Sequence, residues 1–216
     1  DRVFYERLIF LGKKIDNKLS SHIISLMIYL SMENYKKDIF LFINSPGGDA
    51  VNTFAIYDTM QYVLPDVHTV CMGFAGAMAS LILVGGEITK RLAFPHARIM
   101  ITQPSCRIIR AKVNEIILEA EELFRIRQTM EKIFSQRTGT PLNIISKDME
   151  RQTFMSAKEA KAYGIIDHVA MEKEDDDIKI PDDDKFKKSR EEIENRDINY
   201  NEKDEDGIED KNFNFF

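Results

Sequence analysis

The sequence has no tryptophan, only two cysteines and six prolines, and no long hydrophobic run among its 216 residues. Cys71 and Cys106 both lie in apolar surroundings, so we expect two buried free thiols and no disulfide framework. No cysteines and histidines cluster at zinc-site spacing, so we expect no metal and no other cofactor. A membrane-spanning helix needs roughly 18 apolar residues in a row, and the sequence has no such run, so we expect no membrane insertion. Nucleic-acid binding needs a stripe of basic residues, which the sequence also lacks, so we expect no nucleic-acid partner.

Acidic residues are concentrated near the end of the chain, whose net charge is −6. Residues 172–216 hold 9 Lys and Arg against 18 Asp and Glu, whereas residues 1–171 hold 21 against 18. The acidic, Asn-rich segment has too few apolar residues to offset the entropy of ordering. We therefore predict one folded domain over 1–171 and a disordered tail over 172–216. The first residues do not have the pattern of a leader peptide, so we expect any such leader to be absent or removed.

Strand-like and helix-like segments alternate, which predicts an α/β domain with mostly parallel strands. The run IFLFI is typical of a strand buried on both faces. The helical pattern over 112–137 spans about 40 Å at 1.5 Å per residue, so part of it should project or pack on a partner. Ser20 or Ser21 should cap the first helix, and Ser156 with Glu159 forms a capping box. We expect strands over 8–11, 39–43, 69–74, 98–102 and 165–170, and helices over 20–32, 51–63, 75–84, 112–137 and 156–164.

Seven motifs at near-constant spacing together resemble one family. They are ERLIFLG (6–12), INSPGG (43–48), AIYDTMQYVLPDVHTVCMG (55–73), GGEITKRLAFPHARIMI (85–101), EAEEL (119–123), RTGTPL (137–142) and DMERQTFMSAKEAKAYGIID (148–167). Over residues 3–171 the chain resembles the Clp protease proteolytic subunit, ClpP, most closely its cyanobacterial and plastid branch. The resemblance implies the ClpP/crotonase-like fold, a spiral of ββα units, with a projecting handle helix at about 112–137. It also implies self-association into seven-membered rings that stack in pairs under a Clp-type ATP-dependent unfoldase.

Active members of this family hydrolyse peptide bonds with a serine nucleophile, a histidine base and an aspartate that orients the histidine. The matching positions here hold Ala77, Thr102 and Gln152. Alanine has no lone pair, a hydroxyl is too weak a base at pH 7, and a neutral amide supplies no counter-charge. We therefore expect a catalytically inactive homologue of a serine endopeptidase, of the type called ClpR. It would not be an enzyme, and its role in a Clp protease complex would be structural or regulatory.

The resemblance also assigns backbone groups near these positions. The N–H groups of Gly48 and Met78 match the family's oxyanion hole. An equally weighted interpretation of Gly47 and Gly48 is a turn that requires positive φ or close backbone approach. After Pro104 the chain reads SCRIIR (105–110), one residue shorter than the family and without its Gly-Gly pair. Substrate pairing and docking between rings therefore do not follow from the resemblance alone.

Two surface sites are implied in the same way. Phe40, Phe42 and Tyr62 match a hydrophobic pocket that receives loops of the unfoldase, consistent with aromatic anchors at docking sites. Ordinary core packing is the alternative, because Phe40 and Phe42 share one face of a strand. Glu150 and Arg151 match the ion-pairing residues of the ring interface.

Two other functions remain open from the sequence. A relocated hydrolase site would use Ser80 with His68 or His96, although a serine in such a helix more often bonds to a carbonyl one turn back. A crotonase-type acyl-CoA enzyme would need an acid or base such as Asp49 near its oxyanion hole. The resemblance adds active ClpP subunits as partners. It also implies a plastid-type organelle, either chloroplast stroma or apicoplast.

Overall fold

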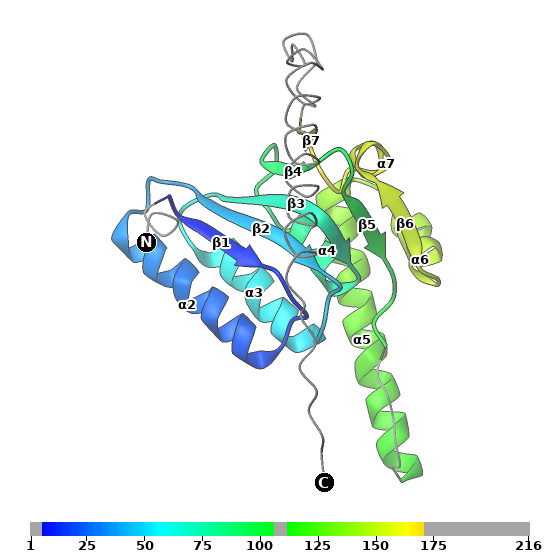
Figure 1. Cartoon of the computed structure of the whole chain (residues 1–216). Helices are drawn as coiled ribbons and strands as arrows, with labels where there is room; N and C mark the ends of the chain where they lie inside the picture. The colour runs from blue at the N-terminus through cyan, green and yellow to red at the C-terminus, as the bar shows by residue number, and fades with distance from the viewer. Residues whose placement is uncertain (1–5, 106–111, 171–216) are drawn as a thin grey trace, which may run out of the picture. The chain divides into compact units, whose positions relative to one another are not determined.

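The computed structural model describes residues 6–105 and 112–170, which form a mixed α/β fold (Figure 1). The strands are β1 (Leu8–Leu11), β2 (Ile39–Ser45), β3 (Val67–Gly76), β4 (Arg91–Ala93), β5 (Arg98–Ile101), β6 (Thr153–Ser156) and β7 (His168–Val169). The helices are α2 (Asn17–Glu33), α3 (Ala50–Tyr62), α4 (Met78–Val84), α5 (Val113–Thr138), α6 (Leu142–Met149) and α7 (Ala157–Tyr163). The predicted tail and Cys106 lie outside the described residues, so the domain division stays a prediction.

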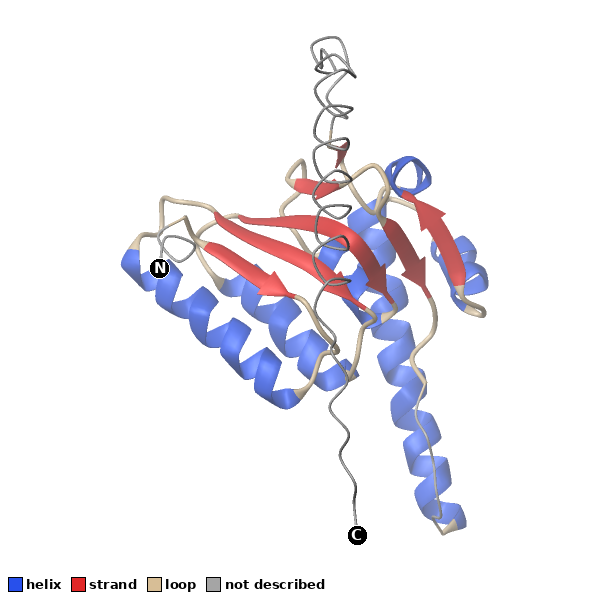
Figure 2. Ribbon diagram, in the orientation of Figure 1, coloured by secondary structure: helices blue, strands red, loops and turns tan. Residues whose placement is uncertain are grey.

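The seven strands form one sheet in the order β1-β2-β3-β4-β7, and β5 pairs with both β3 and β6. Every pairing is parallel except that between β5 and β6. Helices α2 and α3 cover one face of β1–β3, as Figure 2 shows. The predicted α/β class with a mostly parallel sheet is therefore confirmed.

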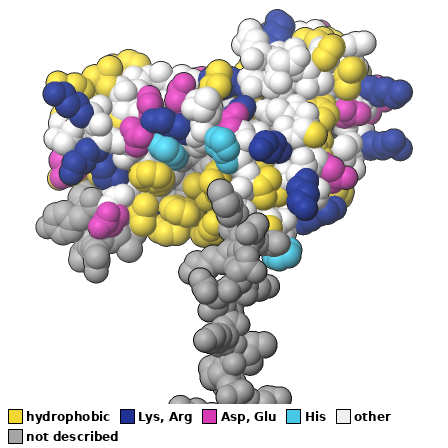
Figure 3. Space-filling model, turned by 90° about the horizontal axis from the view of Figure 1, so that it is seen from above, with side chains coloured by type: hydrophobic (Ala, Val, Ile, Leu, Met, Phe, Trp, Pro, Cys, Tyr) yellow, Lys and Arg dark blue, Asp and Glu magenta, His cyan; other side chains and the backbone are white. Residues whose placement is uncertain are grey.

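Strand β2 is buried on one face only, so the expectation of burial on both faces is wrong. Leu41 and Ile43 are fully buried in the core that α2, α3 and α4 complete. Successive side chains of a strand point to opposite faces, and Phe40 and Phe42 accordingly lie half-buried on the face away from α2 and α3. Figure 3 views the molecule from above and shows hydrophobic side chains gathered near histidines and charged groups.

The short helix α4 is buried along its whole length, because its residues are small or apolar on every side. Leu81, Ile82 and Leu83 are each fully buried, and each contributes about 1.5–3 kcal/mol to folding. The predicted helix over 75–84 begins too early, since Ala75 and Gly76 belong to β3, where they pair with β5. Strand pairing with a distant segment overrides the local helical pattern there.

Helix α5 is the longest element, and it ends at Gly139 with a φ of 75°. Its buried residues, Met130, Glu131 and Phe134, all lie in its C-terminal half. Its N-terminal half extends away from the sheet in Figure 1. Val113 and Leu118 in that half are 71% and 65% exposed, which leaves apolar side chains without cover.

Several predicted element ends differ from those observed. Asp16 caps α2 by accepting a hydrogen bond from Leu19 N at 2.7 Å, so neither Ser20 nor Ser21 is the cap. The last strand has two residues instead of six. Strands β4 and β6 and helix α6 were not predicted, because segments this short have little periodicity. The predicted capping box of Ser156 and Glu159 is confirmed, as both of its hydrogen bonds are present.

Candidate functional site

The site is built around a sharp turn between β3 and α4. Ala77 occupies this turn with φ 49° and ψ −117°, a conformation that non-glycine residues rarely adopt. Its N–H donates to the Met100 carbonyl at 2.9 Å, which fastens the turn to β5. Gly47 passes close beneath, where an added Cβ would lie 2.7 Å from the Gly76 carbonyl oxygen. A strand–turn–helix of this shape presents the side chain at its apex, as in the nucleophile elbow of hydrolases.

The sheet register brings the three predicted catalytic positions to neighbouring strand ends. Gly76 pairs with Met100 at the end of β3, so Ala77 adjoins the end of β5. Ile101 pairs with Thr153, so Thr102 and Gln152 lie just beyond the last pair of β5 and β6. Sequence reasoning therefore identified positions that converge in space. Ala77 and Thr102 line the same cavity, whereas Gln152 is exposed outside it.

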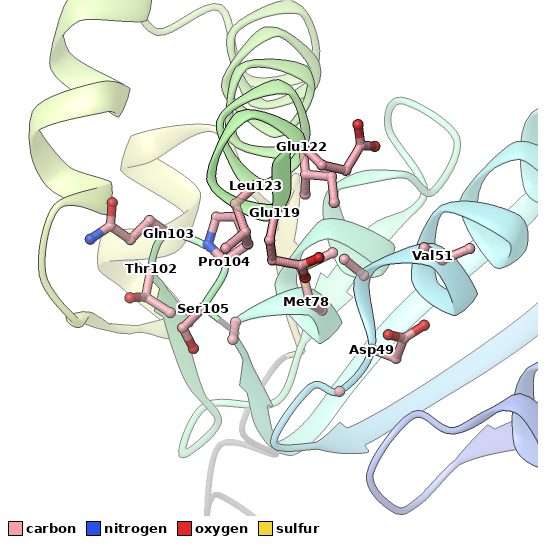
Figure 4. A pocket seen from close by; sticks show the side chains of 14 residues that line it. Asp49, Val51, Met78, Thr102, Gln103, Pro104, Ser105, Glu119, Glu122 and Leu123 are labelled. Atoms are coloured by element: carbon pink, nitrogen blue, oxygen red, sulfur yellow. The ribbon is translucent and has the colours of Figure 1, made fainter. Parts of the chain in front are cut away.

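A cavity of about 320 Å³ opens beside Ala77 (Figure 4). Its lining comes from four parts of the chain: the β2–α3 connection with the start of α3, the β3–α4 turn, the segment after β5, and helix α5. The lining residues are Gly48, Asp49, Ala50, Val51, Ala77, Met78, Thr102, Gln103, Pro104, Ser105, Glu119, Glu122, Leu123 and Ile126. No histidine is among them, and apolar side chains share the walls with carboxylates and hydroxyls.

The β2–α3 connection is held by close backbone contacts. Gly47 has a φ of 95°, and a Cβ on Gly48 would lie 2.6 Å from Ile15 N, so the predicted glycine requirement is confirmed. Asp49 Oδ2 accepts hydrogen bonds from Asn52 N at 3.0 Å and from its Nδ2 at 2.8 Å. Because the Asp49 carboxylate caps α3, its geometry disfavours the acid–base role of an acyl-CoA enzyme.

Arg127, which sequence reasoning missed, fixes the segment that follows Thr102. Its Nη1 donates to Gln103 Oε1 at 2.7 Å, its Nε donates to Glu131 Oε1 at 2.7 Å, and its Nη2 donates to Ser146 Oγ at 3.1 Å. This guanidinium therefore joins α5, α6 and one wall of the cavity. The Arg–Glu spacing of four residues was visible in the sequence, but it is common on helices and indicates no site.

The relocated triad is not assembled around Ser80. Ser80 is fully buried, and its hydroxyl donates to the Ala77 carbonyl at 2.6 Å. His68 lies near the other end of β3, about 30 Å from Ala77 by strand rise, where its Nε2 lies 2.7 Å from Asp38 Oδ2. A fully buried serine whose hydroxyl is held by a backbone carbonyl is not placed to attack a bound peptide.

The aromatic residues assigned to unfoldase docking do not meet within one chain. The Phe40 ring packs at a tilt against His68 with ring centroids 4.4 Å apart, and Phe42 stacks on Phe10 at 5.2 Å, both on the sheet face away from α2 and α3. Tyr62 ends α3 and is 84% exposed. It borders a separate surface depression of about 500 Å³, together with Ile28, Ser31, Met32, Tyr35, Val63 and Leu64.

Glu150 and Arg151 lie in the connection between α6 and β6. Glu150 is the C-cap residue that follows α6, and its carbonyl accepts a long hydrogen bond of 3.4 Å from Gln103 Nε2. Within residues 6–105 and 112–170, neither Glu150 nor Arg151 forms an ion pair. Their predicted role at a ring interface is therefore not tested by a single chain.

Cys71 lies within β3 as a buried free thiol, as predicted. Burial raises the pKa of this thiol to about 12, so it stays protonated and is not a nucleophile at neutral pH. Among the described residues, no three His, Cys, Asp or Glu side chains are grouped to hold a metal ion. In the same part of the chain, no helix combines the length and apolar character needed to cross a membrane.

The mixed α/β fold, the strained strand–helix turn and the adjoining groove resemble the strand–turn–helix site of hydrolases. Sequence comparison agrees, since the family described as Clp protease matches residues 1–173. The chain belongs to the Clp protease family. The "ATP-dependent Clp protease proteolytic subunit" of Dioscorea elephantipes is 60% identical over 174 residues, covering 81% of this chain and 86% of the relative. Subunits of the same name from Nicotiana tabacum and Spinacia oleracea are each 59% identical over 172 residues, covering 80% of this chain and 88% of the relative.

These relatives correct one prediction. The expectation that the chain is not an enzyme is wrong, because relatives at about 60% identity are named proteolytic subunits of an ATP-dependent protease. That expectation depended on only three side chains, Ala77, Thr102 and Gln152, whereas the similarity extends over 174 residues.

Proposed function

We propose that the chain is a structural and regulatory subunit of an ATP-dependent Clp-type protease, in which its groove holds an extended peptide. The observation that carries this proposal is the cavity of about 320 Å³ at the strained turn, with Ala77 and Thr102 at the family's serine and histidine positions. The backbone N–H groups of Gly48 and Met78 would bind peptide carbonyls there. Active ClpP subunits would be its partners in the same ring.

The ring itself is part of the proposal. The sheet and helices would form the ClpP/crotonase-like spiral of ββα units, with α5 as its handle. The uncovered apolar side chains of α5 support a contact with another chain, because burying them favours assembly. Glu150 and Arg151 would form ion pairs across ring contacts. Seven-membered rings, single or stacked, would result.

The unfoldase would dock where two neighbouring chains meet. Phe40 and Phe42 lie on the sheet face away from α3, whereas Tyr62 ends α3, so one chain alone does not form the predicted pocket. Adjacent copies in a ring would bring these aromatics together into one hydrophobic site for loops of a Clp-type ATPase. The plant relatives support a plastid-type organelle as the location.

The relatives' names favour a second candidate, in which this chain hydrolyses peptides with a hydroxyl other than one at position 77. Ser105 is the exposed serine among the cavity-lining residues. It would need a base from outside the cavity, because no histidine lines it.

The deciding experiment uses the chain alone and mixed with an active Clp proteolytic subunit. Native mass spectrometry measures ring composition, a fluorogenic peptide measures hydrolysis, and intact mass after fluorophosphonate treatment detects a reactive serine. A structural and regulatory subunit enters the mixed ring and changes its hydrolysis rate. An adduct on Ser105 supports the second candidate, whereas failure to enter rings or change the rate overturns the first.

A further inference from the structure

The groove beside Ala77 combines apolar walls with an acidic rim. Val51 of α3 and Leu123 and Ile126 of α5 line it with aliphatic carbon. The carboxylates of Asp49, Glu119 and Glu122 also line it, and the lining residues that the structure describes include no Lys, Arg or His. A bound peptide side chain therefore meets hydrocarbon and negative charge in the same cavity.

The three carboxylates differ in the hydrogen bonds and ion pairs that they form within the chain. Asp49 caps α3 through Asn52, and Glu122 Oε2 lies 3.7 Å from Arg125 Nη1. In the described part of the chain, no hydrogen bond or ion pair holds Glu119. Figure 4 shows the Glu119 carboxylate turned from α5 toward Met78 and the cavity. Glu119 is thus the carboxylate available to a ligand.

We propose that this groove selects peptides with a lysine or arginine side chain, and that Glu119 is the residue that binds the cationic group. The inference rests on the proposed function, since it requires that the groove hold a peptide. Lysine and arginine suit both kinds of wall, because their aliphatic stems pack on Val51 and Leu123 while the charged end reaches a carboxylate. An apolar peptide side chain would remove water from the Glu119 carboxylate without giving it a hydrogen-bond partner, which is unfavourable. An acidic peptide side chain would be repelled by the like charge of Glu119.

The test measures binding of fluorescein-labelled extended peptides to the assembled chain by anisotropy. The peptides are identical except for one central residue, which is lysine, methionine or glutamate. We expect the lysine peptide to bind roughly threefold more tightly than the methionine peptide, because Glu119 is exposed and an exposed ion pair contributes only modestly. The glutamate peptide should bind most weakly.

Matched variants then locate the preference. In Glu119→Gln the lysine peptide should lose this advantage, while the methionine peptide binds as before. Glu122→Gln on the same helix, and Glu115→Gln near its start, should each retain the preference and thereby control for general attraction to an acidic chain. Retention of the preference in Glu119→Gln, or equal binding of the lysine and methionine peptides to the unmodified chain, overturns this inference alone. Absence of binding by every peptide overturns the peptide-holding groove itself.

Discussion

Ala77 keeps a φ of 49° without the glycine that such a conformation usually requires. A non-glycine residue in this region costs about 1–3 kcal/mol, so its surroundings must hold it. The Met100 carbonyl accepts a hydrogen bond from the Ala77 N–H. The Ala77 carbonyl in turn accepts hydrogen bonds from both Ser80 N and Ser80 Oγ. The strained turn therefore persists even though the residue at its apex has only a methyl group.

Substitution Ala77→Gly should relieve this strain and raise the free energy of unfolding by about 1 kcal/mol, after allowing for glycine's greater entropy when unfolded. Urea unfolding followed by circular dichroism measures the change. Ala79→Gly, in the buried and regular part of α4, is the control and should lower stability by about 1–2 kcal/mol. Equal losses in the two variants would show that the turn is not strained.

At the scale of elements, the Arg91–Asp167 pair joins β4 to the chain just before β7. Arg91 Nη2 donates to Asp167 Oδ1 at 2.7 Å and its Nε donates to Oδ2 at 2.9 Å. Its Nη1 also donates to the Arg137 carbonyl near the end of α5, at 3.1 Å. Burial alone would raise the pKa of Asp167, but the hydrogen bonds from the Arg91 side chain and backbone outweigh it and hold that pKa below 3.8.

This pair should make stability depend on pH. Because the Asp167 pKa is lower in the folded state, its contribution is fully present above the ordinary value of 3.8 and is lost as pH falls through the lowered value. Asp167→Asn should cost about 3 kcal/mol at pH 7, since it leaves the buried Arg91 charge uncompensated. Between pH 5 and about pH 3, the free energy of unfolding of Asp167→Asn should also change less than that of the unmodified chain, as measured by urea unfolding.

Asp66→Asn provides the comparison for this result. Asp66 Oδ2 lies 2.7 Å from Lys90 Nζ, but its side chain is 47% exposed. An exposed ion pair contributes at most about 1 kcal/mol, so this variant should change stability little. If Asp167→Asn and Asp66→Asn lowered the free energy of unfolding equally, burial of Arg91 would not explain the contribution of its pair with Asp167 to stability.

At the scale of the whole molecule, α5 leaves a row of apolar side chains uncovered by its own chain. Phe124 is 58% exposed and Leu118 is 65% exposed. Aromatic residues at the centre of an interface often cost 2 kcal/mol or more when truncated. Assembly of several chains is the arrangement that would bury them.

Phe124→Ser should therefore weaken self-association at least tenfold, which sedimentation velocity over a dilution series would measure. Its far-UV circular dichroism should remain that of the unmodified chain, because Phe124 is not in the core. Ile88→Ser is the control, since Ile88 is 51% exposed but lies outside α5. Unchanged association of Phe124→Ser would contradict the assembly through α5.

The sequence by itself determined the family and the α/β class, and it predicted which residues occupy the three catalytic positions. It also placed the ends of α5 within one residue, because a 26-residue helix has many repeats of its period and a glycine at its end. Its motifs are local, so they could be identified before any contact was known.

Only the tertiary structure decided how these pieces act together. It extended β3 through Gly76, imposed the positive φ of Ala77, and left Phe40 half-buried although its strand is apolar throughout. It also connected Arg127 to Gln103, which lies 24 residues away in the chain. The physical reason is that strand register, the covering of each sheet face and side-chain bridges between elements depend on which distant segments meet, and periodicity within one segment carries no information about them.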